Sequence, residues 1–180
     1  MMSVPGFNVV DQLQALRRYA RSLARNESDA EDLVQQTLVQ AYVKRSTFQQ
    51  GGNLRAWLFG ILHNAFISEW RRSVAEARRI QDSTDFRPDH QSPDQEHAVR
   101  LAQIREAFFA LPEDQRAVLH LVGIEGMSYA DAAATLGIPV GTLMSRLSRA
   151  RAALRDFEQA PSAEGRRIAA LRVIGGTDEL

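Results

Sequence analysis

The sequence predicts an all-α protein made of two small helical domains, which are joined by a flexible acidic linker, with a helix-turn-helix in the second domain. Three observations predict this class. Apolar residues recur at helical spacing along most of the 180 residues. Residues that typically cap helix N-termini precede several of these runs, and no segment shows the sustained apolar–polar alternation of a half-buried strand.

Composition excludes several classes of site. The chain has no cysteine, which rules out disulfides, cysteine-ligated zinc, iron–sulfur clusters and thiol nucleophiles, and which fits a reducing cytoplasm. No apolar run approaches the roughly 18 residues of a membrane-spanning helix, and Met1–Val10 lacks the pattern of a signal peptide. We therefore expect a cytoplasmic protein with no membrane insertion, no metal and no cofactor.

The first domain, residues 8–75, is predicted to begin with two helices. Helical spacing places the first at about residues 10–25. Ser28 and Glu31 fit a capping box, in which each side chain accepts a hydrogen bond from the other residue's backbone N–H. They predict a second helix that starts there and runs to about Arg45.

A break and a third helix follow. Gly51 and Gly52 disfavour a continuing helix, because glycine loses much backbone entropy in a helix and readily adopts positive φ. Asn53 is then expected to cap a long helix whose apolar residues extend to Trp70.

The next stretch, residues 76–92, is predicted to be an acidic linker. It lacks apolar periodicity, and residues 76–97 carry three basic and six acidic side chains. At the other end of the chain, residues 157–180 form a C-terminal extension to which the sequence assigns no role.

The second domain, residues 93–156, is predicted to be helical throughout. Ser92 and Pro93 fit a cap and a first-turn proline for a helix that ends near Ala110. Leu111-Pro112 separates this helix from the next one. A short helix then begins after Ser128 and is closed by Gly137, and a longer helix covers Val140–Arg155, which together give a helix-turn-helix pattern.

The longer helix has an apolar stripe on one side and hydroxyls with arginines on the other. The stripe consists of Leu143, Leu147, Ala150 and Leu154. The polar positions are Thr142, Ser145, Arg146 and Arg149, at i, i+3, i+4 and i+7. Arginine pairs bidentately with guanine and hydroxyls bond base edges or phosphate, so this face suits a major-groove reader. A helical hairpin with a solvated basic face stays open as the alternative.

The net charge of zero, from 22 basic and 22 acidic residues, argues at first against a nucleic-acid partner. The charge is nevertheless unevenly distributed. Residues 1–75 carry nine basic and six acidic side chains, and residues 98–155 carry seven and five. Neutrality is therefore a cancellation between two basic domains and two acidic segments.

The second predicted helix has an unusual outer face. Asp32, Gln35, Gln36 and Val39 lie at i, i+3, i+4 and i+7. They lie opposite the side of the helix that carries its apolar residues, such as Leu33 and Ala41. A solvated face more often carries lysine and glutamate. The composition suits contact with a protein partner, although a face that merely keeps the protein soluble fits the same chemistry.

Two blocks of residues resemble a known family. In the first domain these are residues 29–38 (DAEDLVQQTL), Phe48, residues 53–59 (NLRAWLF) and His63-Asn64, which resemble domain 2 of bacterial extracytoplasmic-function (ECF) sigma factors. In the second domain, LPEDQR from Leu111, GMSYADAA from Gly126 and PVGTLMSRLSRAR from Pro139 resemble domain 4 of the same family. The resemblance covers about residues 10–155.

The resemblance implies three sets of binding residues. It implies that Asp32, Gln35, Gln36 and Val39 dock on the clamp helices of the polymerase β′ subunit. It implies capture of a flipped base and backbone contacts at the promoter −10 element by Phe48, Gly51, Gly52, Asn53, Leu54, Arg55, Asn64, Arg71 and Arg72. It implies −35 recognition by Ser145, Arg146 and Arg149, to which the helix pattern adds Thr142 and, for a backbone contact, Arg151. Met144 departs from the family pattern, where many relatives carry Lys or Arg.

The resemblance also implies partners. These are core RNA polymerase, through its β′ clamp helices and its β flap, promoter DNA, and an anti-sigma factor. The linker would thread toward the RNA-exit path of the polymerase, where acidic residues mimic RNA phosphates. Gly51-Gly52-Asn53 and Leu121-Val122-Gly123 favour the general-stress-response branch.

Two other classes compete with this interpretation. A conventional helix-turn-helix regulator would need neither the Asp32 face nor the residues between Phe48 and Asn64. An enzyme is disfavoured because the four histidines are scattered without metal-ligand spacing and no glycine-rich phosphate loop follows a strand.

Overall fold

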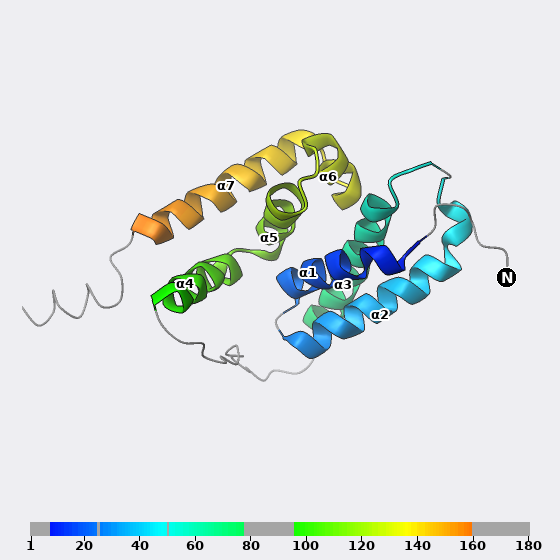
Figure 1. Cartoon of the computed structure of the whole chain (residues 1–180), viewed down its shortest axis with the longest axis horizontal. Helices are drawn as coiled ribbons and strands as arrows, with labels where there is room; N and C mark the ends of the chain where they lie inside the picture. Colours follow the sequence, from blue (N-terminus) through cyan, green and yellow to red (C-terminus); the bar gives the residue numbers. More distant parts are fainter. Residues whose placement is uncertain (1–7, 25, 50, 78–95, 160–180) are drawn as a thin grey trace, which may run out of the picture.

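The structure is a computed structural model that describes residues 8–24, 26–49, 51–77 and 96–159. Within these ranges every regular element is helical, which confirms the predicted all-α class (Figure 1). In chain order the elements are η1 (Val10–Gln12), α1 (Leu13–Leu23), α2 (Glu27–Val43), η2 (Arg45–Thr47), α3 (Leu54–Ala77), α4 (Glu96–Ala110), α5 (Glu113–Leu119), η3 (His120–Ile124), α6 (Tyr129–Leu136) and α7 (Val140–Gln159). η3 is a single π-helical turn.

Helices α1, α2 and α3 pack against one another and form the N-terminal domain. The apolar residues of α1 face the other two helices, and Leu16, Tyr19 and Leu23 are buried. Leu33 and Val34 of α2 and Leu58 and Leu62 of α3 fill the space between them. Burial of these side chains, more than helix propensity, is what holds three helices together.

The capping box predicted at Ser28 and Glu31 is wrong. Asn26 is the N-cap of α2: its Oδ1 accepts a hydrogen bond from the backbone N–H of Asp29 at 2.8 Å. The Asn26 side chain also donates from Nδ2 to Asp29 Oδ2 at 2.9 Å. Because this pair satisfies the helix N-terminus two residues earlier, Ser28 lies inside the first turn of α2.

The predicted break between the second and third helices and the predicted cap of the third are confirmed. Asn53 Oδ1 accepts from the backbone N–H of Ala56 at 3.0 Å and so caps α3. Gly51 has φ of +82°, a value that residues with a Cβ rarely adopt, and it belongs to the turn that separates α2 from α3. Helix α3 continues to Ala77, so the predicted linker begins as helix.

The C-terminal domain contains the predicted helix-turn-helix in α6 and α7. Ser128 caps α6 by accepting from the Asp131 N–H at 3.1 Å, and Gly137 ends it in the left-handed conformation with φ of +65°. Pro112 precedes α5, as predicted. The predicted cap Ser92-Pro93 lies outside the described residues, as do most of the linker and residues 160–180 of the C-terminal extension.

The two domains pack directly on each other, which the sequence did not predict. α1 contacts α5 and η3, and α3 contacts α6 (Figure 1). Tyr19 lies fully buried at this junction, with its ring centroid 5.2 Å from that of Phe59 in α3 and 5.1 Å from that of His120 in η3. One apolar core therefore runs through both domains. None of the helices described here is long and apolar enough to cross a membrane.

Candidate functional site

The face of α2 predicted to meet a protein partner is solvent-exposed and longer than expected. Asp32, Gln35 and Gln36 are exposed, and Val39 is 65% exposed. Tyr42 and Val43, at 59% and 70% exposure, continue the same face because they follow Val39 at i+3 and i+4. Sequence reasoning missed these two, although their spacing could have identified them. We call the six residues the α2 face.

The loop between α2 and α3 brings together the first five residues predicted to bind the −10 element, which are Phe48, Gly51, Gly52, Asn53 and Leu54. The Phe48 ring packs on Trp57 of α3 with centroids 5.4 Å apart. The Gly52 N–H donates to Gln49 O at 2.9 Å, and a Cβ at Gly52 would lie only 3.0 Å from that same oxygen. A side chain at Gly52 would therefore push the backbone of this tight turn by a few tenths of an ångström.

The remaining residues predicted for the −10 element lie further along α3. Asn64 is exposed and lies roughly 15 Å beyond the start of the helix, at a rise of about 1.5 Å per residue. Arg71 and Arg72 are exposed near the C-terminal end, and Arg72 lies 3.8 Å from Glu69. These residues follow the loop along one helix and are not gathered around it.

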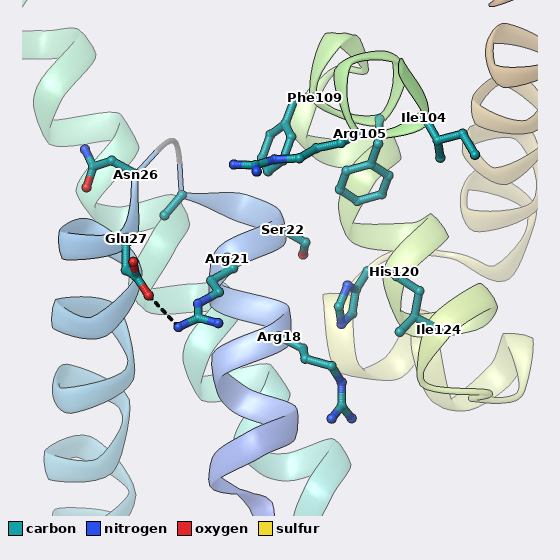
Figure 2. Close-up of a pocket in the computed structure, with 12 residues that line it drawn as sticks. Arg18, Arg21, Ser22, Asn26, Glu27, Ile104, Arg105, Phe109, His120 and Ile124 are labelled. Carbon is teal, nitrogen blue, oxygen red and sulfur yellow. Dashed lines mark hydrogen bonds and ion pairs between the residues drawn. The ribbon is translucent and has the colours of Figure 1, made fainter. Parts of the chain in front are cut away.

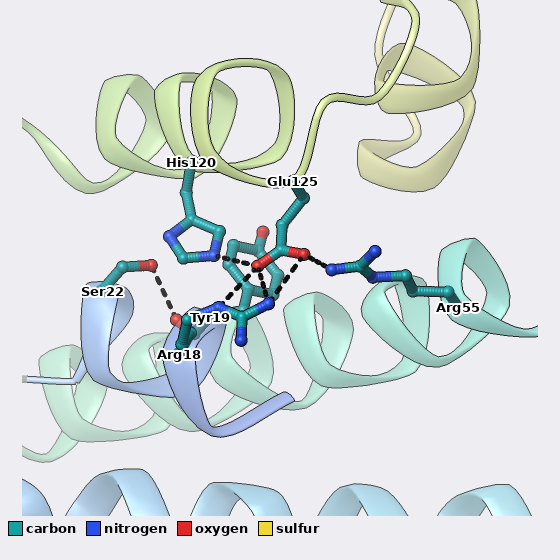
Figure 3. Close-up of polar contacts among 6 residues, drawn as sticks. All are labelled: Arg18, Tyr19, Ser22, Arg55, His120 and Glu125. Carbon is teal, nitrogen blue, oxygen red and sulfur yellow. Dashed lines mark hydrogen bonds and ion pairs between the residues drawn. The ribbon is translucent and has the colours of Figure 1, made fainter. Parts of the chain in front are cut away.

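Arg55 behaves differently from the other residues predicted to contact DNA. It is half-buried and forms an ion pair with Glu125 of the C-terminal domain (Figure 3). The sequence predicted a DNA contact for this guanidinium, whereas the structure pairs it with a carboxylate seventy positions away along the chain.

Glu125 is the centre of a cluster that joins the two domains. Its side chain is 0% exposed, and Arg18 of α1 donates to Oε1 from Nε at 3.2 Å and from an Nη atom at 3.1 Å. His120 Nε2 lies 3.3 Å from the same oxygen. Figure 3 shows Arg18 and Arg55 meeting the carboxylate from the N-terminal domain while His120 and Glu125 come from the other domain. We call these four residues the Glu125 cluster.

The local backbone explains how Glu125 reaches this position. The Glu125 N–H donates to His120 O at 3.0 Å, which closes the π turn of η3. Gly126 then turns the chain with φ of +67°. The turn leaves His120 and Glu125 on the side that faces α1 and α3.

Burial and charge determine the protonation of the groups at the junction. Burial, followed by the charges of Arg18 and Arg55, lowers the pKa of His120 from 6.5 to about 3. The ring is therefore neutral, and Nε2 carries its proton because the carboxylate can only accept. Burial lowers the pKa of Arg55 first, and the charge of Arg18 adds to this effect. Burial likewise raises the pKa of the Tyr19 hydroxyl well above its usual range.

Helix α7 presents the predicted −35 residues to different degrees. Ser145, Arg149 and Arg151 are exposed, and Thr142 is half-buried. The Ser145 hydroxyl donates to Thr142 O at 2.9 Å, and Arg149 Nε donates to Ser145 O at 3.3 Å. Both side chains are held along the helix by these local bonds.

Arg146 is the predicted −35 residue that the structure engages most strongly. Its side chain is 28% exposed and pairs with Asp114 of α5 at 3.0 Å. Burial, together with the charge of Arg146, lowers the pKa of His63 in α3 from 6.5 to about 4. The charge of Arg146 on α7 therefore acts across the junction on a side chain of α3.

A groove between the domains was not predicted from sequence. It has a volume of about 620 Å³ and lies between α1, the start of α2, α4 and η3 (Figure 2). Three arginines line it, Arg18, Arg21 and Arg105, together with apolar side chains. The apolar residues are Ile104, Phe108, Phe109 and Ile124. Within the described ranges no group of three or more potential ligands could hold a metal ion.

Comparison with known proteins assigns both domains. The family profile of the sigma2 domain of PhyR matches residues 9–63, and that of sigma-70 region 4 matches residues 101–154. The ECF RNA polymerase sigma factor EcfG of Rhodopseudomonas palustris is 40% identical over 87% of this chain and 86% of its own length.

Solved structures agree with these matches. The sigma factor RpoE of Bartonella quintana, in complex with the anti-sigma factor NepR, is 39% identical with a TM-score of 0.75, covering 84% of this chain and 94% of its own. CnrH, in complex with the cytosolic domain of CnrY, is 31% identical with a TM-score of 0.61, covering 86% of each chain. The chain therefore belongs to the ECF RNA polymerase sigma factors.

Proposed function

We propose that this chain directs core RNA polymerase to specific promoters, with the C-terminal domain recognising the −35 element and the N-terminal domain recognising and melting the −10 element. The observation that carries the proposal is the presence, on one chain, of an exposed α2 face and an exposed recognition helix. A conventional helix-turn-helix regulator needs the recognition helix, α7, but not the α2 face. Acting with core polymerase places the protein in the cytoplasm.

The α2 face is proposed to bind the clamp helices of the β′ subunit. Its polar half consists of Asp32, Gln35 and Gln36, and its apolar half begins at Val39. Exposed apolar side chains beside short polar ones give the mixed composition of a protein–protein interface. The β flap is the proposed contact of the C-terminal domain.

The loop from Phe48 to Leu54 is proposed to capture an extruded base of the −10 element. Gly51 and Gly52 are exposed, and the Nδ2 group of Asn53 and the amide of Asn64 are offered to a base edge. Arg71 and Arg72 supply exposed cations for phosphate groups.

On the recognition helix, Arg149 and Ser145 are proposed to read base edges and Arg151 to contact phosphate. Arg151 borders a hollow of about 310 Å³ with Tyr129, Ser148 and Arg155, on a different arc of α7 from Arg149. Met144 borders the same hollow and is 51% exposed. Where many relatives carry a cation, this residue offers an apolar contact.

An anti-sigma factor is proposed to inhibit this chain by docking in the groove between the domains. The groove places arginines beside Ile104, Phe108 and Ile124. This lining matches an amphipathic helix whose apolar face is bordered by acidic side chains. The solved complex of RpoE with NepR supports an inhibitor of this kind, and likeness to EcfG supports the general-stress-response branch. Ile104→Ser and Ile124→Ser should weaken capture by an anti-sigma candidate encoded beside this gene.

Polymerase binding by the α2 face tests the proposal. Asp32→Ala combined with Gln35→Ala should weaken binding of the full chain to purified core polymerase by about tenfold or more, while duplex-DNA binding stays unchanged. Val10→Ser is the matched control, because Val10 is 71% exposed but lies outside the α2 face. Equal loss of polymerase and DNA binding would show that the two activities are not divided between the domains as proposed.

A further inference from the structure

We infer that Glu125 competes with promoter DNA for the N-terminal domain, because it holds Arg55 and Arg18 in a closed arrangement that must open before Arg55 can reach a phosphate group. The inference rests on the proposed function for the role of Arg55 at the −10 element. It concerns this chain in the absence of any inhibitor.

Glu125 occupies the guanidinium N–H groups of Arg18 and Arg55 that a DNA phosphate would need. Arg18 approaches the carboxylate with two nitrogen atoms, at 3.1 and 3.2 Å from Oε1, and Arg55 pairs with it from α3. A carboxylate and a phosphate present similar oxygen pairs to a guanidinium. Arg55 cannot serve both at once, and it begins the helix that directly follows the proposed base-capturing loop.

The cluster depends on Glu125 for its charge balance. Arg18 and Arg55 bring two positive charges to one carboxylate, and His120 is neutral. Without Glu125 the two guanidinium groups would face each other at the junction with no compensating anion. Arg18 and Arg55 are 51% and 38% exposed, so water screens their repulsion, but no anion would offset it. Separation of the domains would let water hydrate both guanidinium groups fully.

The rest of the junction fixes the orientation in which the two domains meet. Arg116 of α5 is 5% exposed and donates to the carbonyl oxygens of Ser22 and Leu23 at the end of α1, at 3.0 and 3.3 Å. Gly60 of α3 faces α6: a Cβ added there would lie 3.5 Å from Thr135 O. These contacts fix how the domains meet, while the ion pairs of Arg18, 51% exposed, and Arg55, 38% exposed, remain within reach of solvent.

The domain separation can be measured directly in the full chain. Because the protein has no cysteine, Gln14→Cys in α1 and Ala153→Cys in α7 introduce two exposed labelling sites for single-molecule energy transfer. Glu125→Gln should raise the ratio of open to closed molecules by about threefold or more, since each partly exposed pair contributes about 0.2–1 kcal/mol. Glu106→Gln, which removes an exposed carboxylate on α4, should leave the ratio unchanged. Far-UV circular dichroism establishes that each variant keeps its helix content.

A steric pair of variants tests the closed arrangement without changing any charge. Gly60→Phe should push α6 away from α3 and open the domains, whereas Gly60→Ala places only a Cβ at ordinary contact distance and should leave them closed. Both substitutions favour the α3 helix, since glycine is a poor helix former, so loss of folding is not expected.

The competition is tested with a labelled mixed-sequence single strand of DNA. Glu125→Gln and Gly60→Phe should each tighten binding several-fold, and adding Arg55→Gln to Glu125→Gln should abolish the gain while the domains stay open. Three results would each overturn the inference: no opening in Glu125→Gln, opening without tighter binding, or a gain that survives Arg55→Gln. The energy-transfer readout needs no polymerase, so its failure is distinguishable from failure of the proposed sigma function.

Discussion

Arg146 of the recognition helix pairs with Asp114 of α5 across 3.0 Å, and its charge also contributes to lowering the pKa of His63 in the other domain. A side chain that the family resemblance assigns to the −35 element is thus held by a carboxylate within its own domain. Its availability to DNA depends on how readily that pair breaks.

Asp114→Asn should strengthen binding of the full chain to duplex DNA. The substitution frees Arg146 and removes a negative charge that would face the phosphates. Exposed pairs of this kind contribute about 0.2–1 kcal/mol, so we expect an affinity gain of about two- to fivefold at low salt, shrinking as salt rises. Fluorescence anisotropy over a salt series measures it. If Glu106→Gln gave the same gain, the effect would reflect net charge alone.

Arg149 and Arg151 should differ in what their loss does to sequence preference. Arg149→Ala should cost about 1–3 kcal/mol on promoters with the preferred −35 sequence and little on others, because a base contact discriminates. Arg151→Ala should weaken binding on all sequences alike and reduce the salt slope by about one. Competition binding across a set of −35 sequences separates the two. An equal loss on every sequence for Arg149→Ala would make it a phosphate contact.

The apolar half of the α2 face should contribute to polymerase binding without contributing to stability. Val39→Ser and Tyr42→Ser remove side chains that are 65% and 59% exposed, so the melting temperature should change little. Affinity for core polymerase should fall by about tenfold for the pair. Surface plasmon resonance with immobilised core measures this. Unchanged affinity in both variants would restrict the interface to the polar half.

Stability should fall as the pH is lowered from about 6.5, the pKa of an unfolded histidine, toward about 4, the folded pKa of His63. The pKa values of His63 and His120 are lowered from 6.5 to about 4 and about 3 in the folded protein, so the unfolded chain takes up protons first. The free energy of unfolding is therefore highest above pH 6.5 and declines by about 3 kcal/mol between pH 6.5 and pH 5, since each pH unit below the unfolded pKa costs about 1.4 kcal/mol per histidine.

The double variant His63→Gln, His120→Gln should flatten this decline, since the glutamine amide does not titrate. His120→Gln keeps an N–H donor for the Glu125 carboxylate, because the glutamine amide carries an NH2 group. Urea titrations at several pH values supply the free energies. A decline that is equally steep in the double variant would assign it to carboxylates.

Local features of this fold were predictable from the sequence because their interactions are local. Asn53, Ser128 and Gly137 each satisfy backbone groups within a few residues, and all three boundaries are confirmed. The start of α2 was missed because Asn26 and Ser28 both fit a cap, and only the hydrogen bond to Asp29 distinguishes them.

The junction between the domains could not be predicted, because its partners are distant in sequence. Arg18 and Glu125 are 107 positions apart, and nothing near either residue specifies the other. A lone arginine on a predicted helix fits solvent, DNA or an ion pair equally well. Arg55 was therefore assigned to DNA by resemblance, whereas its contact in the folded chain is a carboxylate.

The most direct test of the central claim is run-off transcription with purified core RNA polymerase. The template should be a pool of promoter-containing fragments from the genome that encodes this chain. The account predicts discrete transcripts that appear only when the chain is added, and that disappear with Asp32→Ala and Gln35→Ala while DNA binding persists. Absence of any new transcript with active core, or repression of existing ones, would contradict the assignment as a sigma factor.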